Sequence, residues 1–386
     1  MNNIFDYELD DLKAILTPSF RAKQVWHWLY IAYQSDFNMM INIPKDLRQK
    51  LQANFSAKNL RIEKLQTSKD GTKKYLFKTN DNKTFESVLI KMREKQSDEN
   101  GNVVSSEKWT ICVSSQIGCK IGCKFCKTAE SGFERNLSVG EIVEQIVAIK
   151  RDNEIPPQKR VNIVYMGMGE PLDNFDSVVK AIKIISHIDG LSISPKRQTL
   201  STSGISPMIK ALGDLDLGIN LAISLHAVNN QVRNKLMPIN KTYNIESIIE
   251  SVKNFPINTR KRVMFEYLMI KDINDDLHSA KDLVRLLNGI NAKVNIILFN
   301  PFESQKSSAN AFMRPCEKDA NAFADFLISK GIMATIRESR GIDIDAACGQ
   351  LRAKEKDSAK NTAKDSANKS NVSYETNKLN GDENME

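Results

Sequence analysis

From Trp109 onward, short apolar runs alternate with longer segments of helical periodicity, and this alternation constrains the fold more than any other feature. The runs with the length and composition of β-strands are 109–114, 161–166, 197–201, 219–225, 262–269 and 293–299. The segments that predict helices lie near 139–152, 174–188, 205–213, 244–254, 276–289 and 317–330. Six such βα units, followed by a further β-like run at 332–337, indicate a parallel sheet covered by helices.

The unusual motifs of the chain fall at the carboxyl ends of these predicted strands. A cysteine cluster follows the first strand, MGMGEP follows the second, and LSTSG, SLHA and Asn300 end the third, fourth and sixth. In a (β/α) barrel those ends meet on one face, where catalysis takes place. A doubly wound sheet would also accommodate the alternation, but the shared face favours an α/β fold, a partial (β/α)6 TIM-like barrel with a single site.

The chain divides into regions of different composition. Residues 1–56 have helical periodicity and predict a small N-terminal helical accessory domain, in which the basic, aromatic segment 20–33 is a candidate RNA-binding contact. Residues 57–104 contain short β-like runs with an Asp-Gly hairpin signal. Residues 105–352 are expected to form the barrel and a C-terminal segment that carries a cysteine. The tail, 353–386, has almost no large apolar residues and predicts disorder, because it cannot bury enough surface to offset the entropy of ordering.

The composition of the chain bears on its compartment and partners. No apolar run approaches the roughly 18 residues of a membrane helix, and the acidic N-terminus lacks the features of a signal peptide. The chain is therefore expected in the cytoplasm, where its six cysteines are more typical of ligands or reactive thiols than of structural disulfides. The net charge of +8 is compatible with a nucleic-acid partner, although many basic proteins bind none.

Cys119, Cys123 and Cys126 form a C-x-x-x-C-x-x-C motif after the first predicted strand. A structural zinc site needs four ligands, usually as two pairs, and the sequence has no second cysteine pair and no histidine nearby. Three thiolates instead fit a 4Fe–4S cluster in which one iron stays open for an exogenous ligand. The competing interpretation is three buried cysteines that share this spacing by chance.

With its aromatic Phe125, this motif resembles that of the radical SAM superfamily, whose open iron binds the amino and carboxylate groups of S-adenosylmethionine (SAM). More narrowly, CVSSQIGCKIGCKFC (112–126), MGMGEPLDN (166–174), LSTSG, SLHA and DIDAACGQL (343–351) resemble the RlmN family. That family methylates carbon 2 of an adenosine in bacterial 23S rRNA and in certain tRNAs. The resemblance runs from the FRAKQVWHWLY segment to Leu351, implies a radical SAM barrel, and leaves only the tail outside.

The resemblance also implies a SAM site. Gly169 and Glu170 would contact the SAM amino group, and the rest of the pocket would be lined by Ser201, Ser224, Leu225, His226 and Asn300. The residues themselves agree in part, because glycine permits close backbone approach and Glu170 supplies a carboxylate for an ammonium group. His226 taken alone is more typical of a satisfied, half-buried histidine than of a ligand contact.

Two further cysteines acquire roles only through the resemblance, since either alone is typical of a small buried apolar residue. Carbon 2 of adenine is electron-poor and will not attack the methyl group of SAM, so radical chemistry is required. In the implied mechanism, Cys348 takes a methyl group from one SAM, and a second SAM yields the radical that activates this methyl for addition to the base. Cys112 then attacks the Cys348 sulfur, forms a disulfide and releases the product, and the disulfide is reduced before the next turnover.

The resemblance assigns Glu86 as the acceptor of the carbon 2 proton, with Cys112 as the alternative. Taken alone, Glu86 in the β-like run TFESVLIKM predicts a solvated strand residue. Cys316 matches no motif and is expected to be structural.

The implied partners are 23S rRNA, tRNA and an electron donor such as a flavodoxin system, and the chain is expected to be a monomer without membrane contact. The target adenine must leave its stack to reach a site at the mouth of a barrel. The basic run 258–262 and the residues around Arg21 are candidate phosphate contacts. Two alternatives stay open: a Cfr-like enzyme that methylates carbon 8 of the same rRNA adenosine, which Pro171 in MGMGEP disfavours, and a non-catalytic iron–sulfur or zinc RNA-binding protein.

Overall fold

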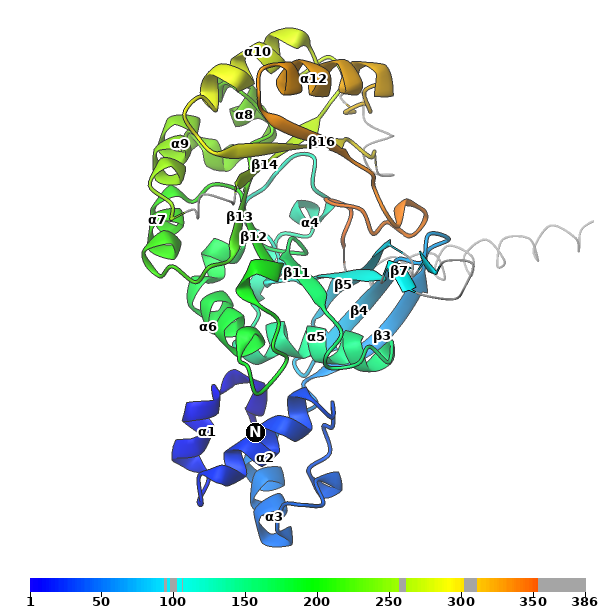
Figure 1. Cartoon of the computed structure of the whole chain (residues 1–386), viewed down its shortest axis with the longest axis vertical. Coiled ribbons are helices and arrows are strands. Elements are labelled where there is room, and N and C mark those ends of the chain that lie inside the picture. The colour runs from blue at the N-terminus through cyan, green and yellow to red at the C-terminus, as the bar shows by residue number, and fades with distance from the viewer. Residues whose placement is uncertain (94–95, 98–102, 106, 257–261, 302–310, 353–386) are drawn as a thin grey trace, which may run out of the picture. The chain divides into compact units, whose positions relative to one another are not determined.

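The residues that the computed structural model describes are 1–93, 96–97, 103–105, 107–256, 262–301 and 311–352 (Figure 1). The tail 353–386, for which the sequence predicts disorder, and most of the basic run 258–262 lie outside the described residues. Over the part of the chain that is described, no helix is both long enough and apolar enough to span a lipid bilayer.

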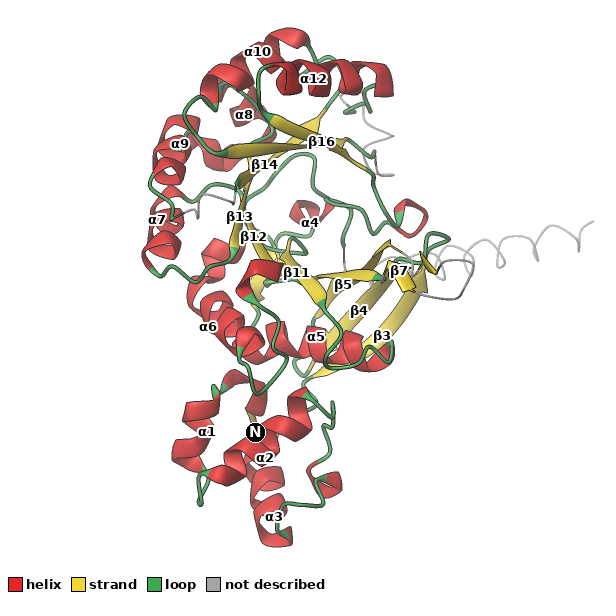
Figure 2. Ribbon diagram, viewed as in Figure 1, coloured by secondary structure: helices red, strands yellow, loops and turns green. Residues whose placement is uncertain are grey.

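A single curved sheet forms the framework of the fold (Figures 1 and 2). Its parallel strands are β8 (Lys108–Cys112), β11 (Val161–Tyr165), β12 (Gln198–Thr202), β13 (Asn220–Ser224), β14 (Val263–Met269), β15 (Ala292–Leu298) and β16 (Met333–Arg337). They pair in chain order, each with the next one along the sequence. The predicted parallel sheet is therefore confirmed, and the run at 332–337 is its last strand.

Helices cover the outer side of this parallel sheet (Figure 2). They are α5 (Val139–Asp152), α6 (Phe175–Ser186), α7 (Ser206–Asp214), α9 (Ile245–Lys253), α10 (Leu277–Leu286) and α12 (Glu317–Ser329), and they confirm the helices expected from periodicity. α5 begins at a capping box, because Ser138 Oγ accepts from Glu141 N at 3.2 Å and Glu141 accepts from Ser138 N at 2.9 Å.

Three antiparallel strands extend the same sheet beyond β8. They are β3 (Leu60–Thr67), β4 (Lys73–Thr79) and β5 (Thr84–Arg93), joined as a meander, and β5 pairs with β8. Over the described residues the sheet has ten strands, with β16 and β3 at its two edges. Because these edges do not pair with each other, the barrel is partial, as the sequence predicts.

The N-terminal helices pack at the side of α5 and α6. They are α1 (Leu9–Ile15), α2 (Phe20–Tyr30) and α3 (Lys45–Asn54). Trp26 of α2 is buried and packs edge-on against His187, which follows α6, with ring centroids 5.4 Å apart. Lys180 of α6 forms an ion pair with Asp11 of α1 at 3.0 Å. These contacts are made by α6 and the residue that follows it, whereas the cysteine motif follows the carboxyl end of β8.

Candidate functional site

The cysteine motif lies between β9 (Gln116–Gly118) and the short helix α4 (Lys127–Glu130), directly after the first parallel strand. Gly118 adopts a φ of +75°, and a Cβ at this position would stand 1.9 Å from Gly132 O. Only glycine therefore fits where the chain turns into the motif. The next residue is held in place because Cys119 N donates to Gly132 O at 2.8 Å.

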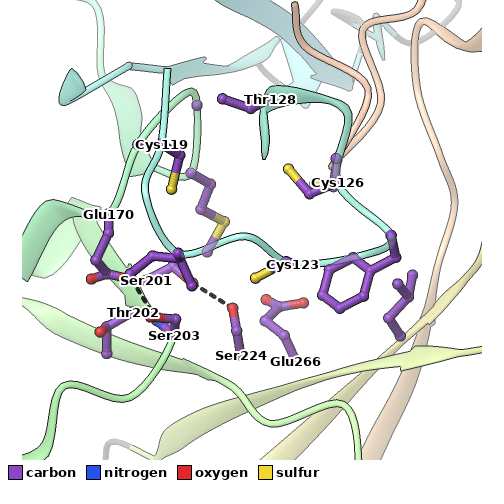
Figure 3. Close-up of a pocket in the computed structure, with 18 of the residues that line it drawn as sticks. Cys119, Cys123, Cys126, Thr128, Glu170, Ser201, Thr202, Ser203, Ser224 and Glu266 are labelled. Atoms are coloured by element: carbon purple, nitrogen blue, oxygen red, sulfur yellow. Dashed lines mark hydrogen bonds between the residues drawn. The ribbon is translucent and has the colours of Figure 1, made fainter. Parts of the chain in front are cut away.

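Cys119, Cys123 and Cys126 line one cavity, and Figure 3 shows their sulfur atoms directed toward a common space. This cavity, called the cluster cavity below, encloses about 970 Å³ including its solvent-open mouth. Burial raises the pKa of the Cys119 thiol to about 12, and it also raises the pKa values of Cys123 and Cys126. At pH 7 all three are therefore neutral thiols unless a bound cation displaces their protons.

The number and direction of the three thiols determine which donor set they offer to a cofactor. Within the described residues, no three His, Cys, Asp or Glu side chains lie close enough together to hold a single ion. A structural zinc site needs four ligands around one atom. Three inward-facing sulfur atoms around a shared space, with one coordination position left over, match the donor set of an iron–sulfur cluster with an open iron.

Gly169 and Glu170 follow β11 and form one wall of the cluster cavity. Gly169 has a φ of +103°, and a Cβ there would lie 2.8 Å from Gln116 N. The Glu170 carboxylate is buried, and its two oxygens accept from Leu172 N at 3.0 Å and from Ser203 N at 2.7 Å. Burial raises the pKa of Glu170, and the two backbone donors oppose this effect. The oxygens keep lone pairs for a cationic ligand.

Ser201, Ser224 and His226 line the cluster cavity from the ends of β12 and β13. The hydroxyls of the two serines lie 3.5 Å apart (Figure 3). His226 has a left-handed φ of +59°, and its Nδ1 accepts from Leu268 N at 3.0 Å. Burial lowers the pKa of His226 to about 3, so the ring is neutral and carries its proton on Nε2. His226 is thus held by a hydrogen bond at Nδ1 and also lines the cavity.

The side chains of two of the predicted SAM residues do not line the cluster cavity. Leu225 is fully buried in the core, and its N–H donates to Glu266 O at 3.1 Å. Asn300 Nδ2 donates to Ser339 Oγ at 2.7 Å, and Asn300 Oδ1 accepts from Arg314. The described residues that line the cluster cavity do not include Leu225 or Asn300.

Cys112 and Cys348 meet at a second cavity, called the thiol cavity below. Cys348 lines both cavities, as do Met166 and Arg337, whereas Cys112 lines only the thiol cavity. Both cysteines are free thiols. Cys348 is exposed, but Cys112 is buried at the end of β8, and burial raises its pKa to about 12, with the Cys348 thiol adding to the effect.

Glu86 is not the solvated strand residue that its local sequence predicts. Its side chain is 3% exposed and pairs with the equally buried Lys74 at 3.1 Å, while Glu86 Oε2 accepts from Arg352 N at 2.7 Å. β5 lies inside the sheet between β4 and β8, and the C-terminal segment covers it, which explains the burial. Burial raises the pKa of Glu86, and Lys74 opposes this effect. The described residues that line the two cavities do not include Glu86.

The cluster cavity is also lined by the carboxylate of Glu266, which the sequence motifs do not predict. Glu266 of β14 is buried, lies in register with Ser224 of β13, and accepts from Asn295 Nδ2 at 3.2 Å (Figure 3). Burial raises the pKa of Glu266. An acidic residue inside the otherwise apolar strand VMFEYLM was the available signal, because a buried charge in a strand normally needs a functional or structural partner.

Comparison with known families matches two parts of this chain. Residues 113–284 match the model of the radical SAM superfamily. Residues 2–56 match the model described as the ribosomal RNA large subunit methyltransferase N-terminal domain. The first match covers the cysteine motif, and the second covers α1 to α3.

Whole-chain relatives are close in sequence and in structure. The chain is 60% identical to the dual-specificity RNA methyltransferase RlmN of Wolinella succinogenes, over 92% of this chain and 97% of that protein. It is 59% identical to the RlmN of Helicobacter hepaticus, over 92% and 95%. The crystal structure of a radical SAM methyltransferase from Sphaerobacter thermophilus matches with a TM-score of 0.82 at 37% identity, over 92% of this chain and 100% of that one. These matches confirm the resemblance read from the motifs, and the chain belongs to the RlmN family of radical SAM methyltransferases.

Proposed function

We propose that this protein methylates carbon 2 of an adenosine in 23S rRNA and in certain tRNAs by radical SAM chemistry. The observation that carries the proposal is the position of Cys348, which lines both the cluster cavity and the thiol cavity. A methyl carrier has to face the source of the methyl group on one side and the resolving thiol on the other. Relatives named dual-specificity RNA methyltransferases, at 53–60% identity, give independent support.

Cys119, Cys123 and Cys126 would hold a 4Fe–4S cluster through their thiolates. When bound, the cluster and SAM together supply a carbon radical after one-electron reduction by a donor such as a flavodoxin system. The protein shields this site with apolar side chains. Phe125 lines the cluster cavity and packs edge-on against the His226 ring, with ring centroids 4.9 Å apart. Restricted water access protects a reactive radical from side reactions.

The walls of the cluster cavity would orient SAM. Glu170 would accept from its ammonium group with the lone pairs that Leu172 N and Ser203 N leave free. The hydroxyls of Ser201 and Ser224 and the Nε2–H of His226 offer hydrogen bonds to the rest of the molecule. Gly169 belongs to the same wall. Leu225 would contribute only through its backbone, and Asn300 would exchange its present partners to complete the pocket.

Cys348 and Cys112 would carry out the two sulfur displacements. The Cys348 thiolate bonds to the methyl carbon of SAM as the bond from that carbon to the sulfonium breaks, which gives S-methylcysteine and S-adenosylhomocysteine. This carbon would lose one hydrogen atom to the radical and join carbon 2 of the base, and the adduct would then release the carbon 2 proton and one electron, which the cluster would take back. Cys112 would next give up its proton and attack the Cys348 sulfur. The sulfur–carbon bond breaks, the carbon takes a proton, and a disulfide remains that an external reductant reopens.

Glu86 is the proposed acceptor of the carbon 2 proton, and Cys112 is the second candidate. The carboxylate of Glu86 is engaged by Lys74 and by Arg352 N, so proton transfer to it requires the segment ending at Arg352 to move. Cys112 needs no such movement, because it already shares a cavity with Cys348.

The exposed position of Cys348 is compatible with a flipped adenine entering from a large RNA. The helices of residues 1–56 would contact that RNA, and Arg21 on α2 is a candidate phosphate contact. The protein would act in the cytoplasm as a monomer.

The test is anaerobic reconstitution with iron and sulfide, followed by reaction with SAM, reductant and 23S rRNA. The proposal predicts 5′-deoxyadenosine, S-methylcysteine at position 348, and 2-methyladenosine in the product RNA, each detected by mass spectrometry. Cys119→Ala should lose the cluster absorbance and the iron, whereas Cys316→Ala should keep both. An adenosine methylated at carbon 8 would favour the Cfr-like alternative, and zinc in place of iron would refute the proposal.

A further inference from the structure

Arg233 is a fully buried arginine on the short helix α8 (Asn230–Leu236), and it contacts the backbone of Ser203 and Ser224, which line the cluster cavity. Among the residues that the structure describes, its hydrogen bonds all go to neutral oxygen atoms. Its Nη2 donates to Ser203 O at 2.6 Å and Ser224 O at 3.1 Å, and its Nε donates to Leu225 O at 3.0 Å. Its Nη1 donates to Asn240 Oδ1 at 2.9 Å and to Tyr243 O at 3.4 Å.

No carboxylate of the described residues forms an ion pair with this guanidinium. Arg135 is a useful contrast, because its guanidinium pairs with Asp81 and with Glu141, both at 2.8 Å. A buried cation without a counter-charge is unfavourable, since carbonyl dipoles replace only part of the lost hydration. Arg233 therefore lacks an anion that the folded protein would normally supply.

The surroundings of Arg233 point to where that anion would be. Helix α8 packs directly on the cysteine motif, because Lys124 N donates to Leu236 O at 2.9 Å and Cys123 packs against the apolar cluster that contains Leu236. Arg233 therefore lies on a helix that directly contacts the loop carrying the three cysteines.

We propose that the counter-ion of Arg233 is the iron–sulfur cluster held by Cys119, Cys123 and Cys126. Three thiolates outweigh the positive charge of the iron–sulfur core, so the bound cluster is an anion, and one-electron reduction makes it more negative. A buried cation beside it favours loading of the cluster and favours its reduced form. Arg233 is therefore a positioning residue that also sets the reduction potential. This inference rests on the cluster of the proposed function.

The experiment compares Arg233→Met, Arg233→Gln and Arg233→Lys after reconstitution with iron and sulfide. The midpoint potential of each cluster is measured by anaerobic redox titration followed by electron paramagnetic resonance. The Met and Gln variants should have a midpoint potential about 59 mV lower than that of the wild type. At a fixed solution potential this shift corresponds to a roughly tenfold lower ratio of reduced to oxidised cluster. Arg233→Lys keeps the charge and should stay close to the wild type.

The matched control is Arg197→Met, at the opposite end of the parallel strands. Arg197 is half-buried and donates to the neutral Asn162 at 3.2 Å. Like Arg233, it bonds to a neutral partner, but it lies far from the cysteine motif. Its removal should leave the potential unchanged.

A second readout does not require a reducible cluster in the variant. Thermal unfolding of cluster-free and cluster-loaded protein should show that loading stabilises the wild type more than Arg233→Met or Arg233→Gln. A variant that folds without cluster but fails to load supports the inference. Equal gains on loading, or a potential that falls as far in Arg233→Lys as in Arg233→Met, would overturn it. If the wild type itself binds no iron, the proposed function fails instead, so the two failures are distinguishable.

Discussion

Cys348 and Cys112 line the same cavity, but the Cys348 thiol is exposed whereas the Cys112 thiol is buried at the end of β8. The two residues come from the C-terminal segment and from the first parallel strand. This asymmetry suits the order of the proposed reaction, because the exposed thiol meets SAM and RNA first. The buried thiol is needed only after the RNA is attached to Cys348.

Replacing Cys112 by alanine should therefore trap RNA on the protein. Without a resolving thiol, the bond between Cys348 and the methylene carbon persists, so the reaction stops before product release. The adduct should be visible on a denaturing gel and should map to position 348 by mass spectrometry. Cys316→Ala is the control, because Cys316 lines neither cavity. Its thiol donates a hydrogen bond to Asp319 Oδ2 at the start of α12. Recovery of only free, unmodified RNA from Cys112→Ala would count against the resolving role.

Glu170→Gln should weaken SAM binding without preventing cluster loading. A charge-assisted hydrogen bond to an ammonium contributes about 1.5–3 kcal/mol, so the dissociation constant should rise roughly tenfold or more. Equilibrium binding of SAM to the cluster-loaded protein measures this change. Glu250→Gln, on the exposed side of α9, should bind SAM like the wild type. An unchanged affinity in Glu170→Gln would exclude the ammonium contact.

The fold was predictable from the sequence because the relevant signals are local. Apolar runs and helical periodicity identify the βα units, and the motifs that follow the strands place the site on the face where their carboxyl ends meet. The capping box at Ser138 and Glu141 is equally local, since both partners lie within one turn of helix.

The environment of Glu86 was not predictable, because it depends on partners that are distant in the sequence. Lys74 neutralises Glu86 from an adjacent strand, and Arg352 N donates to it from the C-terminal segment, 266 residues away in the sequence. Arg233 is a similar case, since a single arginine in a short, polar helical segment is usually exposed. Only the packing of α8 against the cysteine motif reveals that it is buried.

The pair of Lys74 and Glu86 should be strongly coupled in stability. Lys74→Met leaves a buried carboxylate without its partner and should lower the free energy of unfolding by roughly 3–5 kcal/mol. The double variant with Glu86→Gln should recover much of this loss, because no uncompensated charge remains. Lys210→Met removes an exposed pair with Asp214 and should cost less than about 1 kcal/mol in the same urea titration. Additive effects of the Lys74 and Glu86 substitutions would contradict the coupling.

Glu144 should make stability depend on pH in the neutral range. The buried carboxyl of Glu144 accepts from Asn59 N at 2.9 Å and Leu60 N at 3.1 Å, and burial raises its pKa from 4.5 to about 8. The folded state therefore keeps this proton at pH values where the unfolded chain has lost it. The resulting stabilisation is complete below about pH 4.5 and is lost as the pH rises through about 8.

Urea unfolding of the wild type and of Glu144→Gln at pH 5 and pH 9 measures this effect. Glutamine carries no titratable proton, so the wild type should lose roughly 3–5 kcal/mol more than the variant between the two pH values. Other titrating groups act equally on both proteins and cancel in the difference. If the two proteins lose the same stability, the carboxyl is already ionised in the folded state. The hydrogen bonds from Asn59 N and Leu60 N would then lower the pKa of Glu144 by more than burial raises it. The contact between α5 and β3 would contain a carboxylate.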